Sequence, residues 1–279
     1  MDFCLGISGF LEKSISEYVD IAKRTGMNKL EILFGMNAKT SPQLYRDMKR
    51  GELKKVKRLF NNSGVKPHAL VVPNDFTTAE WREHLKLAKR AVDTALFLQT
   101  GIIVMYGGSF PQFDRSKDDW NYRRMPAISD PLFQQSVVCF KSLIEYTGER
   151  PIRFAIENHD NMTFSWEHFK KFLDSVGSEK IGVAFDPTNF RCLSEDPFIA
   201  FNLLKDRIYH VHLKGAHKVG DMVVFDHFMD RDDFDWSKML KLLKTVYKGV
   251  YVIESLFPDT AEQATIRNME FFKEIATKM

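Results

Sequence analysis

The sequence predicts a single (β/α)₈ TIM barrel that spans residues 1–279, and three observations support this fold class. Short apolar segments alternate along the chain with longer segments whose apolar residues recur at helical spacing. Such alternation is typical of parallel strands joined by helical crossovers. The first strand ends in Gly6-Ile7-Ser8-Gly9, without the GxGxxG turn expected of an open doubly wound sheet. The length also fits one barrel of about 250 residues, and no linker marks a domain boundary.

Eight short segments rich in Val, Ile, Phe and Tyr are expected to form the strands. In chain order they are Phe3–Ile7, Lys29–Phe34, Pro67–Val72, Ile102–Tyr106, Arg153–Ile156, Ile181–Phe185, Ile208–Leu213 and Val250–Ile253. Two long connections follow strands four and seven, at residues 107–129 and 215–234. A barrel keeps its active-site loops at that end of its strands, so we expect both connections near the site, with Trp120 and Tyr122 as candidate pocket walls.

Helix boundaries follow from capping residues. Ser165 is expected to cap the helix that begins at Trp166, and Asp235 is expected to cap the helix Trp236–Val246, because Ser and Asp side chains accept hydrogen bonds from the free N–H groups of a first turn. Glycine is favoured just after a helix end. We therefore expect helices to end before the glycines that follow apolar-periodic segments, which are Gly26, Gly64, Gly101 and Gly177.

The composition indicates an ordinary globular protein, with 44% apolar and 28% charged residues. A net charge of +3 is too small to indicate a nucleic-acid-binding surface. The three cysteines (Cys4, Cys139 and Cys192) form no CxxC pair, which favours a reducing compartment over a disulfide framework. No apolar segment approaches the ~20 residues needed to span a bilayer, and no leader peptide is evident. We expect a cytoplasmic protein that binds neither nucleic acid nor membrane.

Four successive strands each deliver an acid or an imidazole near the carboxyl end. Glu157 closes RFAIE, Asp186 follows IGVAF, His212 lies in IYHVHL and Glu254 follows VYVI. A single charged residue at a strand end is common, but four in succession are not expected by chance. Three carboxylates packed together would repel one another and raise their pKa values unless a cation lay among them. The pattern therefore predicts one divalent metal ion, with Mn²⁺, Mg²⁺ or Co²⁺ favoured and Zn²⁺ as an alternative.

These residues carry a resemblance to a known family. The motifs IENH, FDPTN, HVHLKG and VIES, in this order on successive strands, resemble the xylose-isomerase-like TIM-barrel superfamily. That group includes tagatose 3-epimerase-type sugar epimerases, inosose dehydratases, hydroxypyruvate isomerases and endonuclease IV. The resemblance implies that the metal ligands are Glu157, Asp186, His212 and Glu254. It also implies that Glu157 and Glu254 are the catalytic acid/base pair.

The chain departs from the family pattern in two places. Asn189 stands where endonuclease IV and the tagatose 3-epimerases usually carry a histidine, and Lys218 stands where those epimerases carry an arginine. The first difference, together with the near-neutral charge, disfavours a three-metal nuclease. Both differences leave the substrate open.

Candidate substrate-binding residues lie next to the predicted ligands. They are Asn158, His159, Asn189 and Lys214. Asn158 and His159 could instead support Glu157, and Lys214 could instead neutralise the glutamates. His210 shares a face with His212 and is expected to be a core residue lower in the barrel, and His68 is also expected to be structural.

The combined interpretation is a metal-dependent isomerase or epimerase of a small keto-sugar or polyol ketone. Proton abstraction next to a carbonyl would give a cis-enediolate on the metal, and the second glutamate would return the proton. Two alternatives remain: a lyase of the inosose-dehydratase type, and a non-catalytic sugar-binding or subunit-interaction barrel. The expected partner is a small carbohydrate, and the family resemblance allows a homodimer or homotetramer.

Overall fold

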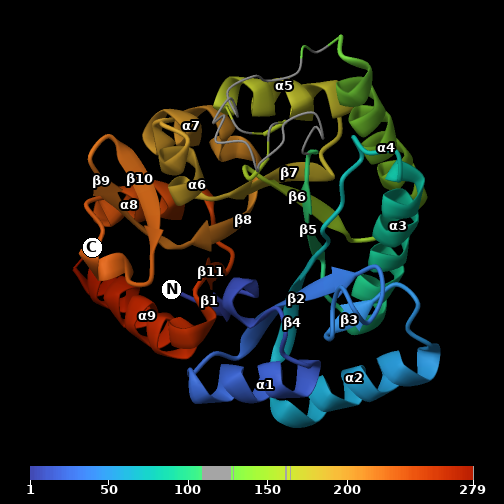
Figure 1. The fold of residues 1–279 in the computed structure, drawn as a ribbon, viewed down its shortest axis with the longest axis horizontal. Helices are drawn as coiled ribbons and strands as arrows, with labels where there is room; N and C mark the ends of the chain where they lie inside the picture. The colour runs from blue at the N-terminus through green and yellow to red at the C-terminus, as the bar shows by residue number, and fades with distance from the viewer. Residues whose placement is uncertain (109–126, 128, 161, 164, 279) are drawn as a thin grey trace.

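The computed structural model describes residues 1–108, 127, 129–160, 162–163 and 165–278, and these form a closed barrel of eight parallel strands (Figure 1). The strands are β1 (Phe3–Leu5), β2 (Lys29–Gly35), β4 (Lys66–Val71), β5 (Ile102–Tyr106), β6 (Arg153–Glu157), β7 (Ile181–Phe185), β8 (Ile208–Leu213) and β11 (Tyr251–Ile253). They pair in chain order, and β1 pairs with both β2 and β11, which closes the ring. The two-residue strand β3 (Leu44–Tyr45) pairs with the carboxyl end of β2. The predicted fold class is confirmed.

Helices surround the ring of strands (Figure 1). In the described part of the chain they are α1 (Ile15–Arg24), α2 (Arg50–Ser63), α3 (Trp81–Leu98), α4 (Pro131–Thr147), α5 (Trp166–Val176), α6 (Pro187–Cys192), α7 (Pro197–Leu204), α8 (Trp236–Val246) and α9 (Ala261–Thr277). Between the strands and this helical layer lies the hydrophobic core. On the α3–α5 side its largest members are phenylalanines that meet edge to face, such as Phe140, which contacts Phe76 at 5.1 Å and Phe172 at 5.5 Å between ring centroids.

The capping predictions are confirmed at most positions. The Ser165 side chain accepts a hydrogen bond from the N–H of His168, and Asp235 accepts one from Lys238. Gly64 and Gly177 are left-handed caps that end α2 and α5. Helix α3 also ends before Gly101, at Leu98, but its left-handed cap is Gln99, with φ 64°.

The end of β1 passes very close to β11. Strand β1 stops at Leu5 rather than Ile7, and a 3₁₀ turn, Ser8–Phe10, follows. A Cβ at Gly6 would lie 2.7 Å from the carbonyl oxygen of Ile253. A residue without a side chain is therefore required there. This close approach places Ser8 beside Glu254, the residue that directly follows β11.

The connection after β8 is more ordered than a loop. We expected residues 215–234 to be a long connection, but they contain an antiparallel hairpin of β9 (Gly215–Val219) and β10 (Met222–Asp226). Gly220 and Asp221 form its two-residue turn, and Gly220 has the positive φ of 59° that such tight turns demand. The Gly-Asp pair was the signal in the sequence.

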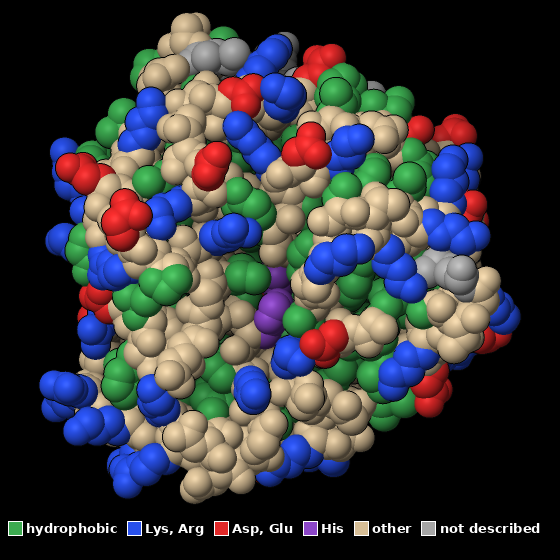
Figure 2. All heavy atoms as spheres, turned by 180° about the vertical axis from the view of Figure 1, so that it is seen from behind, with side chains coloured by type: hydrophobic (Ala, Val, Ile, Leu, Met, Phe, Trp, Pro, Cys, Tyr) green, Lys and Arg blue, Asp and Glu red, His purple; other side chains and the backbone are tan. Residues whose placement is uncertain are grey.

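Figure 2 views the molecule from behind the view of Figure 1. Figure 2 shows Lys and Arg side chains around a central hollow in which a histidine is visible. None of the helices described is long and apolar enough to cross a membrane. The candidate pocket residues Trp120 and Tyr122 lie outside the described residues.

Candidate metal centre

The carboxyl ends of β6, β7, β8 and β11 bring the four predicted ligands together. One donor atom from each of Glu157, Asp186, His212 and Glu254 lies within 4.8 Å of the others. Each of these residues is at most 5% exposed. The four strands are consecutive neighbours in the barrel, so residues at the same height in each strand converge. The arrangement is a buried pocket of three carboxylates and one imidazole.

Asp186 is fixed by the start of a helix. Its Oδ1 accepts hydrogen bonds from the N–H groups of Thr188 (2.8 Å) and Asn189 (3.0 Å), so that it caps α6. Pro187 at the first helical position needs no N–H partner, which suits this cap. With Oδ1 held by the helix, Oδ2 is left to face the pocket.

Neighbouring side chains orient the two glutamates. Asn189 Nδ2 donates to Glu157 Oε1 at 3.1 Å, and Ser8 Oγ donates to Glu254 Oε1 at 2.6 Å. Oε2 of Glu254 also accepts a hydrogen bond, from the Lys214 ammonium at 2.9 Å. Ser8 lies in the 3₁₀ turn that follows β1. It was not identified from the sequence, because serine after a first strand is too common to be informative.

Lys214 supplies positive charge inside the pocket. Its ammonium nitrogen lies 2.8 Å from Asp186 Oδ2, 2.9 Å from Glu254 Oε2 and 3.6 Å from Glu157 Oε1. Burial alone would lower the pKa of Lys214, but the three carboxylates outweigh it and raise that pKa well above its usual value. This geometry matches the second role considered for Lys214, neutralisation of the glutamates.

His212 presents its two nitrogens to different groups. Nδ1 faces Glu157 Oε1 at 3.3 Å and Glu254 Oε2 at 3.8 Å, without a hydrogen bond of good geometry to any residue described. Nε2 lies 3.0 Å from Oε1 of Glu31, a fully buried residue of β2. Burial would raise the pKa of Glu31, but His212 and His210 outweigh it and hold that pKa well below its usual value. Oε1 of Glu31 thus lies at hydrogen-bonding distance from both rings.

The donor set fits a divalent ion. An imidazole nitrogen that makes no hydrogen bond, set among carboxylate oxygens, is the arrangement expected around a metal. Thiolates are absent from the described group, which disfavours a structural zinc site. Burial raises the pKa of Asp186, whereas His212 and Lys214 outweigh burial at Glu157 and lower its pKa. The buried cluster is consistent with a divalent metal.

The other predicted site residues differ in where they lie. Asn158 is fully buried, and its amide both donates to the carbonyl of Asp186 and accepts from its N–H, at 2.9 and 3.0 Å. These bonds tie the end of β6 to the end of β7, which suits support of the ligands better than contact with substrate. His159 is exposed, and its ring packs 5.1 Å from that of Tyr106. It remains a candidate for substrate contact.

His210 and His68 lie below the pocket. His210 is fully buried, with Nε2 2.7 Å from Glu31 Oε1, and its ring stacks on His68 at 5.3 Å. Glu31 is the main residue that sequence reasoning missed. An acid in the middle of the apolar strand KLEILFG was the available signal, because a lone charge in a barrel strand must find a partner in the interior.

Comparison with known proteins agrees with the barrel fold. The model of a family described as xylose isomerase-like TIM barrel matches residues 19–275. Comparison with curated proteins gave no significant sequence match. Three similar solved structures show the range of the fold, each at 14–17% identity.

The first of these structures is an IOLI protein with a bound zinc atom (17% identity, 100% of this chain and 99% of that chain, TM-score 0.74). The second is the probable 3-DHS dehydratase AsbF from Bacillus anthracis (14%, 98% and 99%, TM-score 0.73). The third is a D-allulose 3-epimerase from Methylomonas sp. in complex with D-allulose (15%, 98% and 96%, TM-score 0.74). At these identities the likeness concerns the fold.

Proposed function

Because the chain belongs to the xylose isomerase-like TIM-barrel family, we propose that it is a divalent-metal-dependent isomerase or epimerase of a small keto-sugar or polyol ketone. The observation that carries this proposal is the buried cluster of Glu157, Asp186, His212 and Glu254 at the carboxyl ends of the strands. Enzymes with this fold place their active sites at that end. The similarity to a D-allulose 3-epimerase supports the sugar class.

These four residues would hold the ion, which we propose to be Mn²⁺, Mg²⁺ or Co²⁺, with Zn²⁺ as the alternative. When bound, it would supply Lewis acidity toward a substrate carbonyl and its neighbouring hydroxyl. The protein supplies three carboxylates in fixed positions. Ser8 holds Glu254, the Asn189 side chain holds Glu157, and the first turn of α6 holds Asp186.

Glu157 and Glu254 are the proposed acid and base. They lie on β6 and at the end of β11, with β7 and β8 between them, so they approach the pocket from different sides. One carboxylate removes the proton from the carbon next to the carbonyl, which leaves an enediolate. The other returns a proton, and return on the opposite face gives an epimer.

The residues around this pair have distinct proposed roles. His159 is the candidate for contact with substrate hydroxyls from the exposed rim. Asn189 and Asn158 orient the ligands through the hydrogen bonds described above, and Lys214 balances the charge of the carboxylates. Substrate contact by these three residues requires that they leave their present partners. The proposed partner is a small carbohydrate, and self-association as a homodimer or homotetramer remains a prediction.

Dehydration is the second candidate reaction. It begins with the same proton removal and continues with loss of a hydroxyl group from the next carbon. The similarity to the probable dehydratase AsbF supports it. An enone or diketone product would distinguish this reaction from isomerisation. Tight metal binding without turnover of any sugar would instead favour a non-catalytic binding barrel.

The test separates proton transfer from metal binding. We expect Glu157→Gln and Glu254→Gln each to lower kcat by roughly 10²–10⁴-fold, because general acid–base catalysis contributes on that scale. Metal binding, followed by titration calorimetry, should be weakened but partly retained, since three ligands and an amide oxygen remain. The matched control is Asp160→Asn, another buried carboxylate outside the four-residue cluster. Unchanged turnover in both glutamine variants would refute the acid/base assignment.

A further inference from the structure

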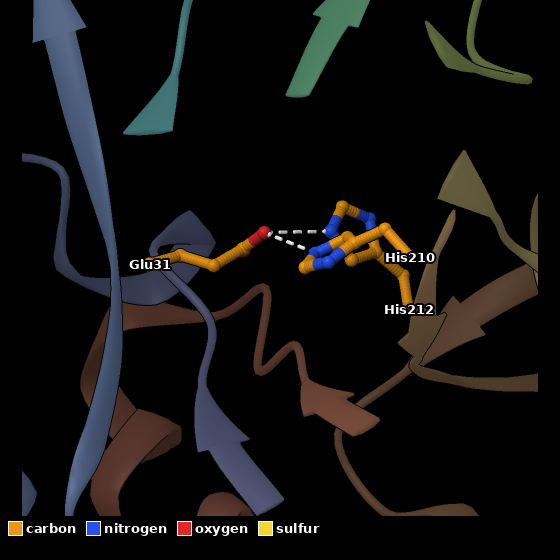
Figure 3. A group of neighbouring side chains, drawn as sticks. All are labelled: Glu31, His210 and His212. Atoms are coloured by element: carbon orange, nitrogen blue, oxygen red, sulfur yellow. Dashed lines mark hydrogen bonds and ion pairs between the residues drawn. The ribbon is translucent and has the colours of Figure 1, made fainter. Parts of the chain in front are cut away.

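Glu31 occupies the interior of the barrel beneath the metal centre. Its side chain is fully buried and points from β2 across the interior toward His210 and His212 of β8 (Figure 3). Strands β2 and β8 are not neighbours in the sheet, since β1 and β11 lie between them. The contact therefore spans the barrel and does not belong to the strand ladder.

The hydrogen bonds fix the protonation pattern of both rings. Oε1 of Glu31 lies 2.7 Å from His210 Nε2 and 3.0 Å from His212 Nε2. A single carboxylate oxygen that lies at hydrogen-bonding distance from both rings accepts from each of them, so each Nε2 carries the hydrogen of its bond. The nitrogen of His212 that remains for a metal is Nδ1, which faces Glu157 and Glu254 at 3.3 and 3.8 Å.

A purely structural role accounts poorly for this arrangement. A buried ion contributes little net stability compared with apolar side chains that fill the same volume. One oxygen, Oε2 of Glu31, makes no hydrogen bond among the residues described, so the charge is not fully compensated. What the arrangement does achieve is a single orientation for the His212 ring, because its two nitrogens face groups on opposite sides.

We propose that Glu31 is a positioning residue of the metal centre, which holds His212 in the Nε2–H form and directs Nδ1 at the ion. His210 donates to the same oxygen and holds Glu31 in place. A carboxylate behind a ligating histidine orients the ring and increases its basicity. This inference rests on the proposed metal-dependent function.

The same three side chains could be read as a second metal site, since their donor atoms also lie within 4.8 Å of one another. Among the residues that the structure describes, three ligands are available there, and one of them, His212, is shared with the four-residue cluster. The hydrogen-bonded arrangement already satisfies both Nε2 atoms. The positioning role therefore predicts one bound ion per chain, and the alternative predicts two.

The first experiment measures Co²⁺ and Mn²⁺ binding by titration calorimetry for the wild type, Glu31→Gln and the Asp160→Asn control. We expect one ion per wild-type chain and a 10–100-fold higher Kd in Glu31→Gln, the usual cost of losing an outer carboxylate. The visible spectrum of bound Co²⁺ should also change in this variant, because the ring of its nitrogen ligand is released. Asp160→Asn should match the wild type in Kd and spectrum.

The outcomes are distinguishable. If the wild type binds no ion, the proposed function fails and this inference fails with it. If the wild type binds one ion and Glu31→Gln matches it in Kd and spectrum, only the positioning role is wrong. Two ions in the wild type, with one lost in Glu31→Gln, would replace the positioning role with a second metal site.

A measurement on the wild type alone covers the case in which Glu31→Gln does not fold. In protein labelled with ¹⁵N-histidine and loaded with ¹¹³Cd²⁺, we expect metal–nitrogen coupling at His212 Nδ1 and a retained hydrogen on Nε2. Coupling at Nε2 would overturn the proposal, because Nε2 could not then donate to Glu31.

Discussion

At the scale of the residue, the main feature of the site is the buried negative charge of three carboxylates. Three carboxylates lie in a pocket with almost no exposure to water, and a buried charge is tolerated only when it is paired. Lys214 provides this pairing, at 2.8 Å from Asp186 and 2.9 Å from Glu254. A bound divalent ion would supply the same kind of charge to the same oxygens. The lysine and the ion therefore compensate the negative charge of the same carboxylates.

Replacing Lys214 should therefore reduce the stability of the protein, and by less when a metal ion is bound. We expect Lys214→Met to lower the free energy of unfolding by about 3 kcal/mol in the presence of EDTA, because removing one partner of a buried ion pair leaves the other uncompensated. The loss should shrink when Mn²⁺ or Mg²⁺ is saturating, since the ion restores positive charge. Urea unfolding with and without metal measures both values. Lys241→Met, at an exposed position of α8, is the control, and an equal loss with and without metal would contradict the account.

The predictability of the site differs from residue to residue for physical reasons. Glu157, Asp186 and Glu254 could be predicted because each ends an apolar strand, and parallel strands bring their ends together. The partners of these ligands could not be predicted. Ser8 and Glu31 reach the site through barrel closure, a contact between segments far apart in sequence that local patterns do not encode. The choice between two roles for Lys214 likewise depended on atomic positions.

At the scale of the element, side chains from strands that are not neighbours in the sheet contact one another inside the barrel. His68 of β4 stacks on His210 of β8, which in turn contacts Glu31 of β2. Burial, with the nearby His210, lowers the pKa of His68 to about 3. The contact is therefore formed by a neutral imidazole.

This shift predicts acid sensitivity. In the unfolded chain His68 titrates near 6.5, so below that pH the unfolded state binds more protons than the folded state. The free energy of unfolding then falls as the pH drops from 6.5 toward 3. We expect His68→Phe, which keeps a ring against His210, to lose about 2 kcal/mol less than the wild type between pH 7.5 and pH 5. Urea unfolding at both pH values tests this, with His159→Phe at an exposed position as the control. Equal losses in His68→Phe and the wild type would refute it.

Element boundaries show where local signals suffice. Strands Ile102–Tyr106, Ile181–Phe185 and Ile208–Leu213 and helix Trp236–Val246 have the predicted bounds, because apolar periodicity and caps are local. The hairpin Gly215–Asp226 was missed although its Gly-Asp turn is also local. Its strands are short and half exposed, so their apolar pattern is weak against a polar background.

At the scale of the whole molecule, one barrel serves several chemistries. Barrel closure and the helical layer belong to the scaffold, whereas the reaction depends on the residues of the site and on the loops around it. The hairpin β9–β10 is one of these loop segments, and the ring centroid of Phe225 from β10 lies 5.5 Å from the Lys214 ammonium. Specificity should therefore be sought at this hairpin. That residues 1–279 form one domain remains a prediction.

The central claim is that this protein moves a proton next to a carbonyl and needs a divalent ion to do so. The direct test is proton NMR in D₂O of a panel of ketoses and inososes incubated with the protein, once with Mg²⁺ and once with EDTA. The account predicts deuterium entry next to the carbonyl of at least one sugar with Mg²⁺ and none with EDTA. Deuterium entry that is equal under both conditions, or absent from every sugar in metal-loaded protein, would contradict it.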